Sequence, residues 1–320
     1  MKKQVLTLDG IITDAKQDLE KKITSTISDT KIVSILEGGK RLRPLLAHLV
    51  FKACMRGKEN FDQYQKALEG AVSIELAHNA SLVHDDIIDK DEERRGKPTF
   101  HTKEGIANAL LTGHRMLAMG FNIALSHGKQ VAKLYVETWD VVVNGEIDEV
   151  DFNRKDINSK EVSAKSKIFD TYIKIIEQKT AILFSSACKA GAIEANMSGD
   201  ILKVFADYGR EIGLAYQLAD DLVDLAKGEL IDSVILPLLS RLETTTKIKN
   251  SLKEKEIREK FTKHSSEIKQ LYIDEIKKHV RNAEKLSKSD VIPSSSYKGL
   301  LTDAPTYIIN KMLKEINVTI

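Results

Sequence analysis

The sequence predicts an all-α protein, and three observations support that fold class. Only five of the 320 residues are proline, about a third of the usual frequency of roughly 5%, while alanine, leucine, isoleucine, lysine and glutamate are abundant. Apolar residues recur at helical spacing over residues 67–83 and again over residues 204–225. Alternation of apolar and polar residues, the pattern of strands, is nowhere sustained. We therefore expect an all-α protein, and because no break in the sequence resembles a flexible interdomain linker, we expect a single domain over residues 1–320.

The first half of the chain shows one long helix between two breaks. The segment EGGKRLRP at residues 37–44 places a glycine pair before a proline that suits the first turn of a helix. Residues 67–83 carry an apolar stripe formed by Leu68, Val72, Leu76, Ala80 and Val83. The segment RRGKPT at residues 94–99 then interrupts the helical pattern.

The second half continues the helical pattern. Residues 177–192 form an apolar helix that begins near Lys179 and Thr180. Residues 204–225 place Phe205, Ile212, Tyr216 and Leu222 at helical spacing. Residues 247–288 are dense in lysine and glutamate, which we interpret as a solvated helix face. The last clear break is VIPSSS at residues 291–296.

Charge and cysteine content exclude several classes of function. Forty-nine basic and 47 acidic residues leave a formal net charge of +2, which gives no reason to expect a nucleic acid or an anionic membrane as a partner. Cys54 and Cys188 have no partner at metal-ligand spacing, which fits a reducing compartment, and we expect both in the core. No uncharged apolar run approaches the roughly 18 residues of a membrane span, and Asp9 interrupts the N-terminal segment. We expect a cytoplasmic protein without a membrane segment.

The segment HNASLVHDDIIDKDEERRGKPT at residues 78–99 is the first with chemical content. Asp85 and Asp89 lie one helical turn apart on one face, with Asp86 beside them. Mg²⁺ is typically held by one or two carboxylates together with substrate phosphate oxygens, so such a pair near Arg94 and Arg95 suggests a diphosphate bound through metal. For an isolated motif, a solvated acidic helix end is the commoner explanation.

A second acidic cluster weakens that explanation. The segment YQLADDLVDL at residues 216–225 repeats the arrangement with Asp220, Asp221 and Asp224 among apolar residues, where unpaired charges are costly. Two such clusters facing across a cavity could share several metal ions.

Cationic residues complement the two acidic clusters. Lys40, Arg41 and Arg43 follow a glycine pair that lets a loop approach a ligand closely, which suggests a phosphate clamp, although a basic loop without function is the alternative. His78 lies seven positions before Asp85 and so shares its helix face, although a lone helical histidine is more often structural. Lys179 could likewise contact an anion, although a lysine at this position is usually a surface residue whose aliphatic chain covers apolar neighbours.

Taken in order, these motifs resemble the trans-isoprenyl diphosphate synthases, also called polyprenyl synthetases. The resemblance covers GGKRLRP, the HDDxxD segment with its double arginine, KTA and YQLADDLVD, spanning Gly38 to Asp224. It implies an all-α bundle of the isoprenoid synthase type around a deep central cavity, generally a homodimer. It also implies a transferase of isoprenoid biosynthesis, a prenyltransferase that condenses isopentenyl diphosphate with an allylic diphosphate and uses two or three Mg²⁺ ions per active site.

The resemblance also implies a role for each matching residue. Asp85, Asp89 and Asp220 would bind Mg²⁺, and Asp86, Asp221 and Asp224 would support them. Arg94, Lys179 and Gln217 would hold the allylic diphosphate, with Thr180 near the reacting carbon, and Lys40, Arg43, His78 and Arg95 would hold isopentenyl diphosphate. As the cation forms, an apolar closed pocket must exclude water, and the departing diphosphate itself would accept the final proton.

Helix geometry adds a prediction about product length. Ser81 and Ala80 lie four and five residues before Asp85, about one turn or ~5.4 Å below the metal face, and Ala77 lies further along. In the family a bulky aromatic residue near these positions stops the chain early, and none is present here. We therefore expect a product of geranylgeranyl length or longer.

Two departures and two alternatives remain. The segment after the second acidic motif is shorter than in the family, so that Lys227 could replace a loop lysine of the family. The family usually has a glycine-glutamine pair before KTA, and this chain has Gly145-Glu146 in its place. The family also has an aspartate after the glycine that corresponds to Gly113, and this chain has His114 there. A class I terpene cyclase would use similar ionisation without a second diphosphate site. A non-catalytic regulatory subunit should have lost acidic ligands, and this chain keeps both clusters.

Overall fold

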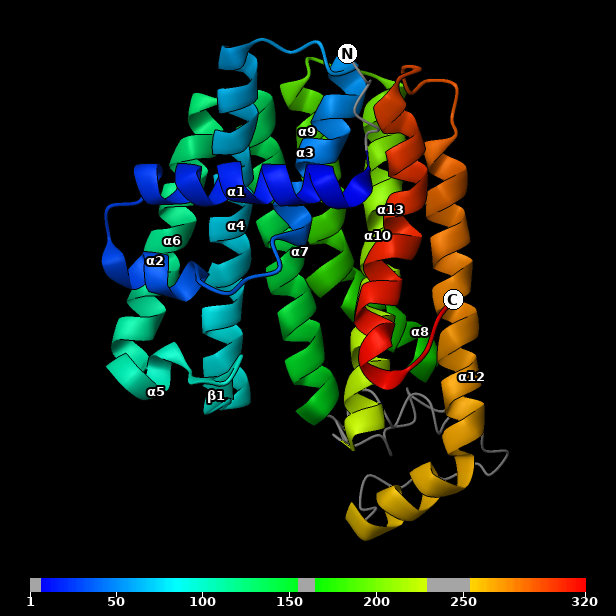
Figure 1. Ribbon diagram of the computed structural model, residues 1–320. Helices are drawn as coiled ribbons and strands as arrows, with labels where there is room; N and C mark the ends of the chain where they lie inside the picture. The colour runs from blue at the N-terminus through cyan, green and yellow to red at the C-terminus, as the bar shows by residue number, and fades with distance from the viewer. Residues whose placement is uncertain (1–6, 155–164, 229–253) are drawn as a thin grey trace. The chain divides into compact units, whose positions relative to one another are not determined.

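The computed structural model describes residues 7–154, 165–228 and 254–320, and within them it confirms the all-α class (Figure 1). The elements are α1 (Leu8–Thr26), α2 (Thr30–Leu36), α3 (Leu42–Met55), α4 (Phe61–Asp89), β1 (Glu93–Arg94), β2 (Lys97–Pro98), α5 (Phe100–Glu104), α6 (Ile106–Ser126), α7 (Lys129–Arg154), α8 (Lys165–Ile176), the π-helix η2 (Glu177–Ala181), α9 (Ile182–Glu194), α10 (Asp200–Lys227), α12 (Glu254–Ser287), α13 (Ser296–Leu313) and the 3₁₀ helix η3 (Lys314–Ile316).

The contacts between residues divide the chain into two compact units. Unit 1 comprises residues 1–137, 186–206 and 287–301, and unit 2 comprises residues 138–185, 207–286 and 302–320. The aspartates of the first motif therefore lie in unit 1 and those of the second in unit 2. The single domain expected from the sequence stays a prediction.

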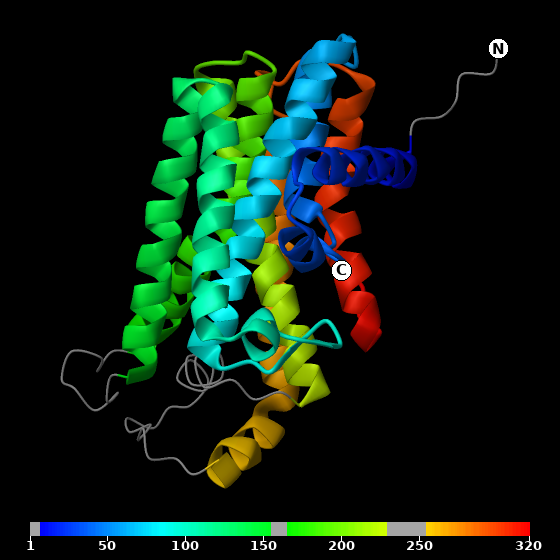
Figure 2. The same cartoon turned by 90° about the vertical axis from the view of Figure 1, so that its left-hand side faces the viewer.

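The core of unit 1 forms where α1 runs across the long helix α4 (Figures 1 and 2). Its buried side chains come from α1, α2, α4 and α6 and include Leu19, Ile32, Leu76, Ala80 and Met116. The apolar stripe that the sequence predicted on residues 67–83 thus faces this core, because burying it stabilises the unit by roughly 25 cal/mol for each Å² removed from water. Asn60 begins α4 with a capping box, in which its side chain and that of Gln63 each accept from the other's backbone N–H.

The helices α4 and α6 approach each other closely within unit 1. The Ser73 hydroxyl donates to the Gly120 carbonyl at 2.8 Å, and a Cβ at Gly120 would lie 2.6 Å from the Tyr135 hydroxyl oxygen. A larger residue at position 120 would therefore push the neighbouring side chain away. Gly113, about two turns earlier in α6, leaves similar room for the ring of His84.

In unit 2, α10 packs against η2 and α9 on one side and against α12 on another. A Cβ at Gly209 would lie 2.3 Å from the Phe184 carbonyl oxygen, and one at Gly213 would lie 2.5 Å from the Ala181 Cα, so α10 approaches η2 and α9 backbone to backbone. On the α12 side, Glu211 accepts hydrogen bonds from His279 at 2.7 Å and Asn282 at 3.1 Å. Burial opposes ionisation of Glu211, but these hydrogen bonds lower its pKa.

Two smaller expectations can be compared with the structure. Cys54 and Cys188 are buried and free, as expected. Within the described ranges, none of the helices has both the length and the apolar character required to cross a bilayer.

Candidate active site

The first acidic motif occupies the last turn of α4. Asp85 is half-buried and Asp89 is exposed, whereas Asp86 points into the protein and accepts from the Arg94 Nε. Burial raises the pKa of Asp86, and the charge of Arg94 opposes that shift. Asp86 therefore supports Arg94, and Asp85 and Asp89 present their carboxylates at the end of the helix.

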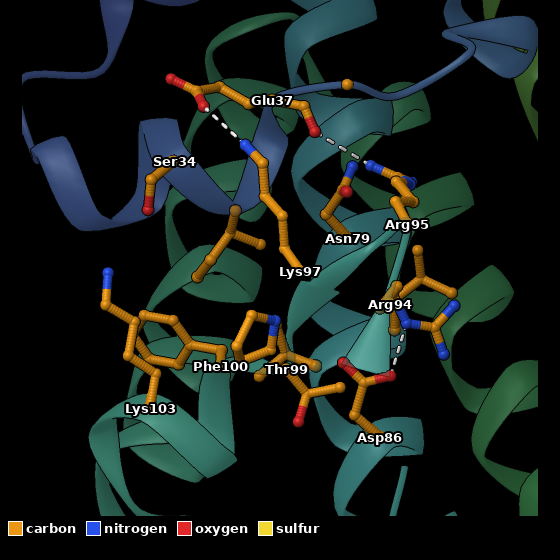
Figure 3. Close-up of a pocket in the computed structure, with 15 residues that line it drawn as sticks. Ser34, Glu37, Asn79, Asp86, Arg94, Arg95, Lys97, Thr99, Phe100 and Lys103 are labelled. Atoms are coloured by element: carbon orange, nitrogen blue, oxygen red, sulfur yellow. Dashed lines mark hydrogen bonds and ion pairs between the residues drawn. The ribbon is translucent and has the colours of Figure 1, made fainter. Parts of the chain in front are cut away.

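The double arginine lies in a tight hairpin formed by β1 and β2. Arg94 pairs with Lys97, and the two loop residues Arg95 and Gly96 both have positive φ, of 55° and 72°. A two-residue turn of this kind matches the twist of the strands, and it costs Arg95 roughly 1–2 kcal/mol because non-glycine residues disfavour this conformation. The turn brings the Arg95 guanidinium to the Glu37 carbonyl, to which it donates at 3.1 Å (Figure 3).

A cavity of about 610 Å³ lies between α2, α4, the hairpin and α5. Figure 3 shows Lys97 reaching the Glu37 carboxylate above it, at 3.6 Å, and Asp86 with Arg94 on the opposite side. Lys40, Arg43 and His78 are not among the residues that line it. Of the residues predicted to hold isopentenyl diphosphate, Arg95 alone therefore borders this cavity.

Arg43 and His78 come together as the sequence predicted. An Arg43 guanidinium N–H donates to the His78 Nε2 at 3.0 Å, so the histidine is neutral and carries its proton on Nδ1. Burial and the nearby arginines, Arg43 first among them, hold the pKa of His78 well below its ordinary value. The buried Nδ1 has no hydrogen-bond partner among the described residues. This N–H is thus a buried donor whose hydrogen bond the described residues do not supply.

Arg41 differs from the expectation for a phosphate clamp. Its side chain is 2% exposed and pairs with Glu75 at 2.6 Å and with Glu20 at 2.8 Å. Only Lys40, which is exposed, and Arg43 remain as candidates for the clamp. Arg41 instead connects the loop before α3 to α1 and α4.

The second acidic motif lies on α10 in unit 2. Asp220 and Asp224 are half-buried and one turn apart, and Asp221 is 5% exposed. Burial raises the pKa of Asp221 to about 7, although hydrogen bonds from Tyr172 and Gln217 favour its ionised form. Asp220 and Asp224 are thus the accessible pair, and Asp221 is a buried support.

A hydrogen-bond chain connects Asp221 to two other predicted residues. The Thr180 hydroxyl donates to the Gln217 Oε1 at 2.7 Å, and the Gln217 Nε2 donates to Asp221 at 2.9 Å. Tyr172 donates its hydroxyl to the other oxygen of Asp221, and the hydroxyl of Tyr272 lies 3.3 Å from that of Tyr172. The chain fixes the orientation of the Gln217 amide and leaves its second N–H directed elsewhere.

Lys179 lies in η2 and contacts two carboxylates of α7. Its Nζ is 2.9 Å from Glu146 and is also hydrogen-bonded to Glu149. A π-helical turn inserts an extra residue into a helix and is frequent at functional sites, because it redirects side chains that a regular helix would stack. The helix that the sequence predicted after Lys179 begins as this turn and continues as α9.

The three residues predicted to set product length lie in the middle of α4. Ala80 is fully buried in the unit 1 core, Ser81 is 6% exposed and donates its hydroxyl to the His78 carbonyl, and Ala77 is 8% exposed. Their role stays a prediction.

The structure thus groups the predicted residues into two sets. Unit 1 contains the first acidic motif, the hairpin arginines, Lys40, Arg43 and His78, and unit 2 contains Lys179, Thr180, Gln217 and the second acidic motif. Sequence reasoning missed Glu149, Tyr172 and Tyr272. Tyr272 is 51 residues from Asp221 on another helix, so no local pattern could have indicated it. Lys227 pairs with Glu315 at 2.8 Å, and most of the shorter segment after it, residues 229–253, lies outside the described residues.

The donor atoms of the acidic motifs fit Mg²⁺. Within the described residues, no three histidine, cysteine, aspartate or glutamate side chains gather into a metal cluster. Each motif instead offers two accessible carboxylates one turn apart, a hard oxygen donor set that leaves coordination positions to substrate phosphate and water. Asp85 and Asp89 in unit 1, and Asp220 in unit 2, are the residues that would hold the ions.

Comparison with known proteins gives a consistent result. Residues 26–231 match the family model described as polyprenyl synthetase. The chain is 34% identical to a geranylgeranyl diphosphate synthase of Methanosarcina mazei over 60% of this chain and 56% of that protein. It is 32% identical to heptaprenyl diphosphate synthase component 2 of Bacillus subtilis over 74% of this chain and 68% of that protein. The chain therefore spans little more than half the length of the M. mazei relative.

Solved structures agree with the sequence comparison. A geranylgeranyl pyrophosphate synthase is 27% identical with a TM-score of 0.74, covering 95% of this chain and 98% of that one. The corresponding synthetase of the archaeon Geoglobus acetivorans is 25% identical with a TM-score of 0.74, covering 93% and 99%.

Proposed function

The chain belongs to the polyprenyl synthetase family, and from that premise we propose that it is a Mg²⁺-dependent prenyltransferase that condenses isopentenyl diphosphate with an allylic diphosphate to a trans-polyprenyl diphosphate. The observation that carries this proposal is the combination of two accessible aspartate pairs with a second candidate anion site, formed by Arg43 and the neutral His78. An enzyme that only ionises one diphosphate needs no such second site. The proposal therefore favours the synthase over the terpene cyclase.

The residues of unit 1 would bind both substrates. Arg94, oriented by Asp86, would hold the allylic diphosphate. Lys40, Arg43 and the Nδ1–H of His78 would hold isopentenyl diphosphate, together with Arg95. His78 is neutral and its Nε2 already accepts from Arg43. Its Nδ1–H would therefore donate one hydrogen bond to the anion without adding a positive charge.

Three residues of unit 2 also have roles toward the allylic diphosphate in this proposal. Lys179 would bind the allylic diphosphate, and Gln217 would offer its second N–H, since its first is fixed on Asp221. Thr180 is fixed on Gln217 and would lie near the reacting carbon. When bound, Mg²⁺ neutralises the negative charge that develops on a departing diphosphate.

Exclusion of water and removal of a proton would complete the reaction. An allylic cation reacts with any nucleophile, so the reacting carbons must meet in a closed apolar site. We assign no protein base, because the departing diphosphate can accept the proton. A product of geranylgeranyl length or longer is supported by the small residues Ala77, Ala80 and Ser81 and by the names of the M. mazei relative and of the solved structures.

We also propose that the protein is a single-domain, cytoplasmic homodimer. The two units alternate along the sequence in three segments each, which supports one domain. The buried free cysteines suit a reducing compartment. On α6 and α7, Leu111, Leu125, Val136, Val143 and Ile147 are between 38% and 68% exposed, and a second copy would cover such apolar side chains.

The test is incubation of the purified protein with isopentenyl diphosphate and each short allylic diphosphate, with Mg²⁺ or with EDTA, followed by chromatography of the dephosphorylated products. We expect elongation that EDTA abolishes. The Asp85→Asn variant should lose activity by orders of magnitude, whereas Asp62→Asn, an exposed aspartate in the first turn of the same helix, should not. Cyclised hydrocarbon without consumption of isopentenyl diphosphate would favour the cyclase, and absence of turnover would favour the regulatory subunit.

A further inference from the structure

The ammonium group of Lys179 is held between two carboxylates. Glu146 lies 2.9 Å from its Nζ, and Glu149, one turn further along α7, is hydrogen-bonded to the same atom. The three side chains are 18%, 17% and 23% exposed, so water screens the contacts only in part. This group of three residues lies wholly within unit 2.

Backbone packing builds this arrangement. A Cβ at Gly145 would lie 2.7 Å from the Cβ of Gln178 and 3.1 Å from the backbone N of Lys179, so α7 is pressed against η2 at this point. Glu146 follows Gly145 directly, and the π-helical turn presents Lys179 on the same side. The close packing of the two backbones therefore positions Glu146 beside Lys179.

The charges of this group oppose an anionic ligand. Two carboxylates against one ammonium leave the group with a formal charge of −1. A diphosphate that is to bind Lys179 must share its three N–H donors with these carboxylates or displace one of them. In either case it lies beside a carboxylate, and like charges at such distances repel.

We propose that Glu146 competes with the allylic diphosphate for Lys179 and thereby sets the affinity of the enzyme for that substrate. This inference rests on the proposed function, which assigns Lys179 to the allylic diphosphate. Glutamine has the size of glutamate and keeps an acceptor oxygen, so Glu146→Gln removes the charge with little change in packing. The substitution should strengthen binding, a gain that misfolding cannot imitate.

The experiment is calorimetric titration with inorganic diphosphate in EDTA, so that no metal bridges the ligand. We expect Glu146→Gln to bind diphosphate about tenfold more tightly than the wild type. Loss of an exposed ion pair changes an equilibrium constant by up to about fivefold, and this ion pair is partly buried, so its effect should be larger. The control Glu137→Gln changes an exposed glutamate on the same helix, whose partner is Lys133, and should leave the affinity unchanged.

A second pair of variants tests whether the gain acts through the lysine. Lys179→Met should bind diphosphate weakly, and adding Glu146→Gln to it should give a smaller gain than the same change gives in the wild type, because only the direct repulsion is then removed. In turnover, Glu146→Gln should lower the KM for the allylic diphosphate and leave that for isopentenyl diphosphate unchanged. Equal or weaker binding by Glu146→Gln, or an equal gain without Lys179, would overturn the inference. A wild type that binds diphosphate but does not elongate would refute the proposed function and leave this titration valid.

Discussion

Replacement of Arg41 by methionine should destabilise the protein without removing a substrate contact. The guanidinium donates to Glu20 at 2.8 and 3.1 Å and to Glu75 at 2.6 Å, and the side chains of Arg41 and Glu75 are each 2% exposed. In the variant, Glu75 keeps the hydrogen bond from Asn79 at 2.8 Å but loses its counter-charge. Removing one partner of a buried ion pair costs about 3–5 kcal/mol, since the other charge remains buried.

The assay is urea unfolding followed by circular dichroism, together with titration of diphosphate. Arg56→Met is the matched control, because Arg56 has nearly the same left-handed backbone, with φ of 56° against 58°, at the other end of α3 but is exposed. It should change the free energy of unfolding by less than about 0.5 kcal/mol. The double variant Arg41→Met with Glu75→Gln should recover much of the loss, because the stranded charge is gone.

A contrary pattern would refute the reasoning. If Arg41→Met unfolds at the same urea concentration as the wild type but binds diphosphate at least tenfold more weakly, Arg41 is a ligand and its ion pairs are incidental.

Three further predictions concern buried groups. Tyr172→Phe should lower the free energy of unfolding by about 1–3 kcal/mol, because a buried Asp221 oxygen loses its donor. Asp221→Asn should change the free energy of unfolding less in the Tyr172→Phe background than in the wild type. Strictly additive effects in urea unfolding would show that the two residues are not coupled. His48 is buried, and burial followed by the charge of Lys52 lowers its pKa to about 4. Because the unfolded chain takes up a proton near pH 6.5 and the native state does not, stability should fall by up to about 3 kcal/mol as the pH drops from 6.5 to 4, and unfolding of His48→Leu at several pH values should lack that decline. Ala80→Phe should shorten the main product and, since Ala80 is fully buried, cost about 1–3 kcal/mol by overpacking; an unchanged product length would mean that Ala80 does not line the growing chain.

The helices and the acidic motifs were predictable because their signals are local. The apolar stripe before Asp85 and the one before Asp220 repeat every three or four residues, which is the period that brings side chains onto one helix face. The same periodicity places the carboxylates of each motif one turn apart, and α4 and α10 confirm both. The break at residues 94–99 was also predictable from Gly96 and Pro98, although its form as a two-residue hairpin was not.

The distinction between neighbouring cations was not predictable. Lys40, Arg41 and Arg43 carry the same charge in one short segment, yet Arg41 is buried against Glu75, Arg43 contacts His78, and Lys40 is exposed. The outcomes for Arg41 and Arg43 depend on side chains 21 to 35 residues away in the sequence. No local sequence pattern indicates which of those distant side chains folding will bring close. The buried tyrosines around Asp221 were not predictable either, since Tyr172 and Tyr272 look like ordinary aromatic residues of their own helices.

By itself, the sequence determined the helical class, the two aspartate motifs and the family, because periodicity and motif spacing act over one or two helical turns. Only the tertiary structure decided which charged groups are buried supports and which are available to a ligand. Burial makes that decision, since taking a charge out of water is tolerated only where folding brings a partner to it, as Glu75 does for Arg41 and as Glu146 and Glu149 do for Lys179.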